Sequence, residues 1–110
     1  MKNYEELLEK AKEWREWYYD GDPGTPEVAK STEEAFNLIN ATLFGHIYQR
    51  PKLDAKIRSL CTIAALIVLD KPNQLPGHIT GALNYGWSKE EIVELITQML
   101  FYGGYPTAVN

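Results

Sequence analysis

Apolar side chains recur at spacings of three and four residues along most of the chain, a pattern that indicates amphipathic α-helices. The first predicted helix runs from Tyr4 to Tyr19 and stops at a turn rich in glycine and proline, residues 21–26. A second helix, capped by Ser31 or Thr32, is predicted to reach about Tyr48, before Pro51 excludes helical geometry. The inward faces expected of these helices are Leu7, Leu8, Ala11, Trp14, Trp17 and Tyr18 in the first, and Phe36, Ile39, Leu43, Phe44 and Ile47 in the second.

Three more helices are predicted in the second half of the chain. Residues 55–69, with Asp54 as a possible N-cap, are apolar almost all round, so this helix is expected to be central and buried. The next runs from about Gln74 to Tyr85 and stops at Gly86. A capping box of Ser88 and Glu91 opens the fifth, which is expected to end at residues 103–104. Its expected inward residues are Ile92, Leu95, Ile96, Met99 and Leu100, and a sixth helix would begin at Thr107.

These elements predict an all-α fold in a single domain, 1–110, in which residues 1–30 form an N-terminal helix and turn. The net charge of −4 argues against a nucleic-acid partner, which usually requires a basic face. No apolar run is long enough to span a membrane, and the first residues lack the apolar core of a signal peptide. A cytoplasmic location without nucleic-acid or membrane partners is therefore expected.

Few residues could carry chemistry. The single cysteine, Cys61, excludes a disulfide within the chain and a Cys-x-x-Cys site, and its apolar helix favours a buried, inert thiol. With two distant histidines, a metal site is not expected. His78 lies among apolar and small residues, so it is either a core histidine bonded to a carbonyl or the proton-transfer group of a pocket. Arg58 stands in an apolar helix and needs a glutamate or a substrate anion as partner, whereas His46 is expected to be half-exposed.

Several motifs together resemble the carboxymuconolactone decarboxylase family over roughly residues 36–110. They are F-G-H-I-Y-Q-R-P-K-L from Phe44, R-S-L-x-T-I-A-x-L-I from Arg58, L-x-x-H ending at His78, A-L-N-x-G from Ala82, E-E-I-x-E-x-x-x-Q from Glu90 and Y-x-G-x-P-x-A-x-N from Tyr102. The motif R-P-x-L followed by R-S-L-x-T-I-A is similar to that of the decarboxylase branch of the family. The alkylhydroperoxide reductase D branch needs Cys-x-x-Cys-x-x-x-His, but Lys71 and Gln74 occupy the cysteine positions, so a dithiol peroxidase is excluded.

The resemblance implies an all-α helical bundle of the alkylhydroperoxide reductase D-like type that assembles as a homotrimer or homohexamer. It also implies a cofactor-free lyase of aromatic catabolism that converts 4-carboxymuconolactone to 3-oxoadipate enol-lactone and carbon dioxide. The residues expected to be catalytic are His78 as general acid or base, Arg58 as the group that holds the carboxylate or lactone oxygens, and His46 as an assisting group. The residues expected to bind substrate are Arg50, Tyr48, Tyr102 and Cys61.

Two departures from the family pattern leave alternatives open. Relatives usually carry an acidic residue where this chain has His46, and the family continues into a helix after the position of Asn110. The first departure is compatible with a cyclase, an isomerase or a decarboxylase that acts on a secondary metabolite. A further alternative is a non-catalytic helical oligomer that binds a small ligand.

Overall fold

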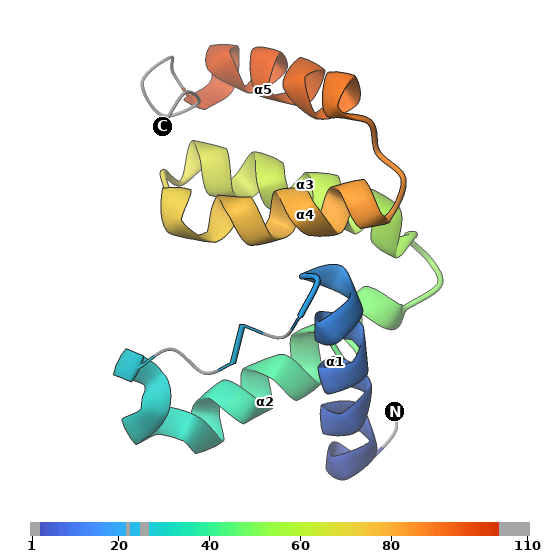
Figure 1. The fold of residues 1–110 in the computed structure, drawn as a ribbon, viewed down its shortest axis with the longest axis vertical. Helices are drawn as coiled ribbons and strands as arrows, with labels where there is room; N and C mark the ends of the chain where they lie inside the picture. Colours follow the sequence, from blue (N-terminus) through green and yellow to red (C-terminus); the bar gives the residue numbers. More distant parts are fainter. Residues whose placement is uncertain (1–2, 22, 25–26, 104–110) are drawn as a thin grey trace. The chain divides into compact units, whose positions relative to one another are not determined.

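The computed structural model describes residues 3–21, 23–24 and 27–103, and these are helical or loop throughout, with no strand among them. Contacts within the chain define two compact units, an N-terminal unit, Met1–Ala55, and a C-terminal unit, Lys56–Asn110. Figure 1 shows the helices in chain order. The all-α prediction is confirmed for the described residues, and the sixth helix predicted from Thr107 lies outside them.

The N-terminal unit contains α1 (Tyr4–Tyr18), the 3-10 helix η1 (Glu27–Thr32), α2 (Glu33–Leu43) and the 3-10 helix η2 (Ile47–Gln49). Asn3 caps α1, because its side-chain oxygen accepts a hydrogen bond from the backbone N–H of Glu6 at 2.9 Å. Thr32 is the N-cap residue of α2, one of the two predicted, but its side chain makes no capping hydrogen bond.

Stacked aromatic rings form the core of the N-terminal unit. The ring of Trp14 lies 4.3 Å from that of Tyr18, 5.2 Å from that of Phe44 and 4.9 Å from that of Tyr48, measured between centroids. All four side chains are buried, so two faces predicted from spacing meet here. Trp17, predicted to point inward, is exposed instead, because the buried stripe of α1 is narrower than the spacing suggested.

α2 ends earlier than predicted. It stops at Leu43 rather than near Tyr48, and the N–H groups of Phe44 and Gly45 both bond to the carbonyl of Asn40. The backbone of Gly45 lies against the carbonyl oxygen of Leu7, where a side chain would overlap it. The chain turns at this close approach. Ile39 and Leu43 are exposed, so the predicted inward face of α2 is wrong at those positions.

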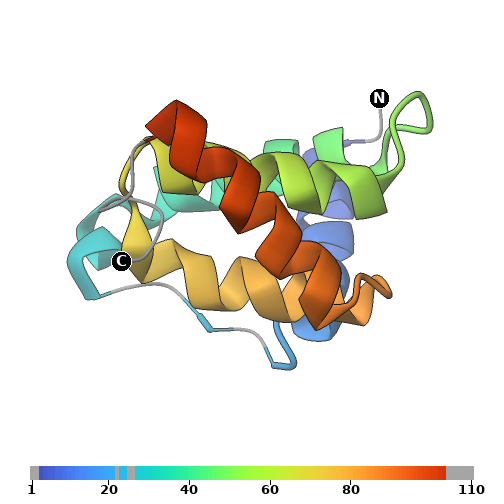
Figure 2. The same cartoon turned by 90° about the horizontal axis from the view of Figure 1, so that it is seen from above.

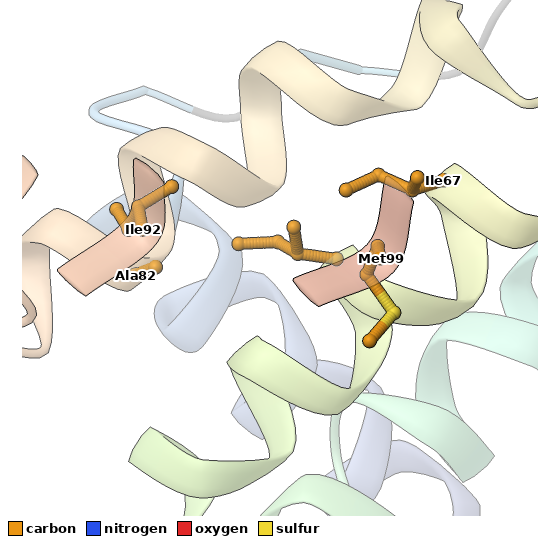
Figure 3. Packing of buried hydrophobic residues seen from close by; sticks show 5 residues of the cluster. Ile67, Ala82, Ile92 and Met99 are labelled. Carbon is orange, nitrogen blue, oxygen red and sulfur yellow. The ribbon is translucent and has the colours of Figure 1, made fainter. Parts of the chain in front are cut away.

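The C-terminal unit contains α3 (Ala55–Val68), the 3-10 helix η3 (Pro72–Gln74), α4 (Leu75–Asn84) and α5 (Lys89–Gly103). α3 and α4 form an antiparallel hairpin, and α5 crosses over both (Figures 1 and 2). The buried core joins all three helices through Ile63, Ile67, Ala82, Ile92 and Met99 (Figure 3). The predicted inward face of α5 is confirmed, since Ile92 and Met99 are buried and its other members pack on this core.

Local signals set the ends of these helices as predicted. The hydroxyl oxygen of Ser88 accepts from the N–H of Glu91 at 3.0 Å, and the carboxylate of Glu91 accepts from the N–H of Ser88 at 2.9 Å. Gly86 ends α4 at φ 95°, a left-handed conformation that favours glycine. The backbone N–H of Trp87 then bonds to the carbonyl of Ala82, which completes the C-terminal cap.

α3 is less buried than predicted. Ser59, Ile63, Leu66 and Ile67 are buried, but Ile57 and Val68 are exposed, and so is Cys61 between them. The expectation of a buried thiol is therefore wrong. When a helix is apolar on all sides, its sequence does not show which side stays exposed after the neighbouring helices pack against it.

Candidate active site

The candidate residues divide between the two units. Arg58, Cys61, His78 and Tyr102 belong to the C-terminal unit, and His46, Tyr48 and Arg50 belong to the N-terminal unit. The surroundings of each residue are therefore those of the helix or turn that carries it within its own unit.

His78 is held in the first turn of α4, on the face that packs into the core. Its side chain is only 7% exposed, and Ala82, one turn later on the same face, is fully buried. Pro76 fits this first turn because its missing N–H has no helical acceptor there. Gly81 and Ala82 bring little bulk beside the imidazole, as the sequence suggested. A histidine in this position is shielded from bulk water.

Arg58 lies in the first turn of α3, and its side chain is partly buried. The hydroxyl of Thr62 donates to the carbonyl of Arg58 at 3.0 Å, and that of buried Ser59 donates to the carbonyl of Lys56 at 2.5 Å. In both hydrogen bonds, a side chain of α3 donates to the backbone of the same helix close to Arg58.

The hairpin relates the positions of Arg58 and His78. The side chain of Trp87, after α4, bonds to the carbonyl of Lys56 in α3, so the end of α4 lies beside the start of α3. Arg58 therefore lies toward the end of the hairpin where α4 finishes, whereas His78 lies in the first turn of α4.

The remaining candidates lie in different surroundings. Tyr48 is buried in the aromatic core described above, and His46, partly buried, directly precedes η2. Arg50 is exposed where η2 ends, Cys61 is exposed on α3, and Tyr102 is 75% exposed in the last turn of α5. The expectation of a half-exposed His46 is confirmed.

Sequence reasoning missed one charged residue. Arg15 is 6% exposed in α1, and its guanidinium Nη1 donates to the side-chain oxygen of Asn40 at 3.2 Å. The spacing of Arg15 along the helix could have indicated its burial, because Arg15 follows buried Ala11 by four residues and precedes buried Tyr18 by three.

Comparison with known proteins identifies the family. The sequence profile of the Carboxymuconolactone decarboxylase family matches residues 33–110, most of the chain. The chain belongs to this family. The match begins close to residue 36, where the motif resemblance begins.

Individual relatives carry two different activities in their names. The chain is 36% identical to 4-carboxymuconolactone decarboxylase of Acinetobacter baylyi over 72 residues, 66% of this chain and 54% of that protein. It is 35% identical to nitrosuccinic acid decarboxylase of Metarhizium robertsii over 79 residues, 72% and 55% of the two chains. An uncharacterized 15.0 kDa protein of Paracoccus denitrificans is 46% identical over 66 residues, 57% and 48%. The chain thus spans about half the length of the curated relatives it matches.

The described residues also lack two features that would point to other kinds of site. No helix among them is long and apolar enough to cross a membrane. Within the same ranges, no three histidine, cysteine, aspartate or glutamate side chains gather as metal ligands would.

Proposed function

We propose that this protein is a carboxy-lyase that removes carbon dioxide from a small carboxylated lactone without a cofactor. The family match, together with two relatives named as decarboxylases, is the observation that carries the proposal. The placement of His78, buried and held at the start of α4, supports it, because such a histidine can transfer a proton without competition from bulk water.

The chemistry needs an electron sink, and an unsaturated lactone provides one. In 4-carboxymuconolactone, the bond between the ring carbon and its carboxylate breaks and carbon dioxide leaves. The electron pair moves through the ring double bond toward the lactone carbonyl. A proton added next to that carbonyl then gives the enol-lactone. The protein needs only to orient the substrate, stabilise the negative charge on the lactone oxygen and deliver one proton.

His78 is the proposed proton donor. Its imidazolium gives a proton to the ring carbon beside the lactone carbonyl, and solvent restores that proton after the product leaves. Histidine suits this step because its ordinary pKa lies near neutrality.

Arg58 is the proposed partner of the lactone oxygen. Negative charge grows on that oxygen while it disappears from the departing carboxylate, so a cation lowers the barrier only at the former. Arg58 at the start of α3 and His78 at the start of α4 belong to the same hairpin, and the proposed substrate lies between them with the long arginine side chain reaching toward its oxygen.

His46 is proposed as an assisting catalytic group, and Arg50, Tyr48, Tyr102 and Cys61 as groups that bind substrate. His46, Tyr48 and Arg50 belong to the N-terminal unit. Arg50 is exposed and can meet a second substrate carboxylate, for which its planar fork of N–H donors is well shaped.

A second substrate class is a small nitro-carboxylate, favoured by the similarity to nitrosuccinic acid decarboxylase. A nitro group next to the breaking bond accepts the electron pair as the lactone carbonyl does, so the same proton donor and the same cation would serve. The presence of His46, where relatives usually carry an acid, is the feature of this chain that could shift the preference between the two substrates.

We also propose that the chain assembles as a homotrimer or homohexamer. Large apolar side chains are strongly exposed in both units, among them Ile39, Leu69, Phe101 and Tyr102. Exposed apolar groups in this number are typical of surfaces that pack against other chains. Light scattering coupled to size-exclusion chromatography would give the mass of the assembly, and a monomer would contradict this part of the proposal.

The test measures carbon dioxide release and loss of lactone absorbance with 4-carboxymuconolactone, and then with nitrosuccinate. Wild type is compared with His78→Ala, and helical circular dichroism and assembly mass are recorded for both. Turnover that disappears in a correctly folded His78→Ala supports the assignment. Full turnover in that variant, or no turnover of either compound by assembled wild type, contradicts it.

A further inference from the structure

α2 carries an apolar face on a different side from the one where Asn40 bonds to Arg15 of α1. A groove of about 360 Å³ follows this face and is lined by Leu38, Ile39, Thr42, Leu43 and Ile47. The side chains of Leu38 and Ile39 are 50% and 57% exposed. Their spacing to Thr42 and Leu43 places all four on one side of the helix, and we call this side the outer face of α2.

The outer face lacks charge along its whole length. Between Glu34 and Arg50 the sequence contains no aspartate, glutamate, lysine or arginine. The exposed side of α1, in the same unit, has the opposite character, since it carries Lys12, Glu13 and Glu16. A helix that is apolar on more than one side is typical of a helix that is covered on both. The outer face of α2 is therefore expected to be a contact surface.

Opposite charges stand at the two ends of this face. Glu33 and Glu34 are exposed in the first turn of α2. At the other end, the side chain of Gln49 donates to the first backbone carbonyl after α2 at 3.0 Å, which holds η2 close to the end of that helix. Arg50 directly follows η2 and is exposed, as is Lys52. The uncharged stripe thus has two carboxylates at its start and two cations at its finish.

This distribution of charge is complementary to itself after half a turn. In an antiparallel pair of α2 helices, the glutamates of each copy meet the cations of the other at both ends, and the helix dipoles are also aligned favourably. A parallel pair would place like charges together. Exposed ion pairs add little affinity but penalise a wrong orientation, so the charges select the orientation and the apolar stripe supplies the contact.

We propose that two copies of this chain pack through the outer face of α2, helix against helix, in antiparallel orientation about a two-fold axis. The axis passes near the middle of the stripe, so that Leu38 of one copy lies against Leu43 of the second copy. Side chains of each helix then enter the groove of the other, as ridges do in packed helices.

The proposal rests on the oligomer proposed above and is independent of the reaction. A two-fold axis pairs copies, so this contact needs an even number of chains and selects the homohexamer rather than the homotrimer. One face of an 11-residue helix is smaller than the roughly 800 Å² per partner of a standard interface. The copies must therefore meet at other surfaces as well.

The first experiment exchanges the charges at the two ends of the face. One variant combines Glu33→Lys with Glu34→Lys, the other combines Arg50→Glu with Lys52→Glu, and light scattering coupled to size-exclusion chromatography gives the mass of each assembly. Either variant alone brings like charges together at both ends, so its mass is expected to fall to half that of wild type. An equimolar mixture brings opposite charges together again, so the mass of wild type is expected to return.

A second variant and a control separate this contact from a general loss of structure. Ile39→Glu places a carboxylate within the uncharged stripe at an exposed position, so the mass is expected to fall by half while helical circular dichroism is retained. Glu13→Lys combined with Glu16→Lys makes the same change of charge on the exposed side of α1 and is expected to keep the mass of wild type.

The outcomes distinguish this contact from the oligomer as a whole. Charge variants that keep the mass of wild type, a mixture that does not recover that mass, or a trimeric wild type overturns the two-fold contact and leaves the oligomer standing. A monomeric wild type overturns both. Turnover of 4-carboxymuconolactone by the wild type decides the proposed reaction separately.

Discussion

The indole N–H of Trp87 donates a hydrogen bond to the backbone carbonyl of Lys56 at 2.7 Å, while the ammonium group of Lys56 lies 4.5 Å from the centroid of the Trp87 ring. The side chain of Trp87 thus contacts Lys56 at two points, its backbone carbonyl and its ammonium group. The pair fastens the start of α3, which carries Arg58, to the turn between α4 and α5. These contacts join the two helices at that end of the hairpin.

Replacing Trp87 with phenylalanine keeps an aromatic ring but removes the N–H donor. The carbonyl of Lys56 then loses the indole bond but keeps that from the Ser59 hydroxyl, so the free energy of unfolding is expected to fall by about 0.5–1.5 kcal/mol. Urea denaturation followed by circular dichroism measures the change. Lys56→Met removes only the charge over the ring and should cost less, up to about 1 kcal/mol. An unchanged midpoint in Trp87→Phe would show that the hydrogen bond does not hold the hairpin.

Gly45→Ala tests the close approach that ends α2. A Cβ at this position would overlap the carbonyl oxygen of Leu7 and stand 2.6 Å from that of Ala41, both backbone atoms that cannot rotate away. The backbone must shift, at a cost of about 1–3 kcal/mol or more in the free energy of unfolding. Urea denaturation is again the measurement.

Gly103→Ala is the matched control for this change. Its Cβ would lie 3.2 Å from the Cα of Val68, which needs only a small adjustment, and alanine favours the helix. A near-neutral effect is expected there. Equal effects of the two substitutions would mean that the contact with Leu7 yields easily.

The same contact explains what the sequence could not predict. Helix positions in the C-terminal unit followed from local signals, because the capping box at Ser88 and the left-handed Gly86 act on neighbouring residues. The end of α2 depends instead on Leu7, far away along the chain. Spacing alone therefore extended that helix to Tyr48.

The spacing of apolar residues also did not predict the burial of some single residues. Arg15 is absent from the inward face predicted for α1, although its cation is stabilised by rings that come from α2 and the turn after it. The prediction of a buried Cys61 rests on the largely apolar composition of its helix, and the exposed side of that helix depends on where α4 and α5 pack. For the proposed active site, the family motifs named the residues, but only the fold shows how far each of them is buried.

The capping box predicts a pH dependence of stability. Hydrogen bonds from the backbone N–H and the hydroxyl of Ser88 hold the pKa of Glu91 below its usual range. A carboxyl group with a lowered pKa in the folded state stabilises that state at pH values above its ordinary pKa. This contribution is lost as the pH falls through the folded-state pKa.

Glu91→Gln keeps the shape and the acceptor oxygen but removes the charge. The variant is expected to melt below wild type at pH 7, and the difference should vanish as the pH falls through the lowered folded-state pKa of Glu91. Melting temperatures of both proteins across pH 3 to 7 make the comparison. Glu90→Gln removes the same charge from the same helix turn outside the capping box. If its difference from wild type followed pH in the same way, a general charge effect would replace the specific one.

Kinetics of Arg58 variants separate stabilisation of the lactone oxygen from simple substrate binding. If the guanidinium acts on the growing charge, Arg58→Met lowers kcat by about a hundredfold with little change in KM, since loss of one such donor typically costs 10²–10³. Arg58→Lys keeps the charge but not the two-pronged geometry, and an intermediate loss of about tenfold is expected. Steady-state rates with 4-carboxymuconolactone provide both constants. A rise in KM at constant kcat would instead place Arg58 on a carboxylate that takes no part in the reaction, and the proton donor His78 would then act without this cation at the lactone oxygen.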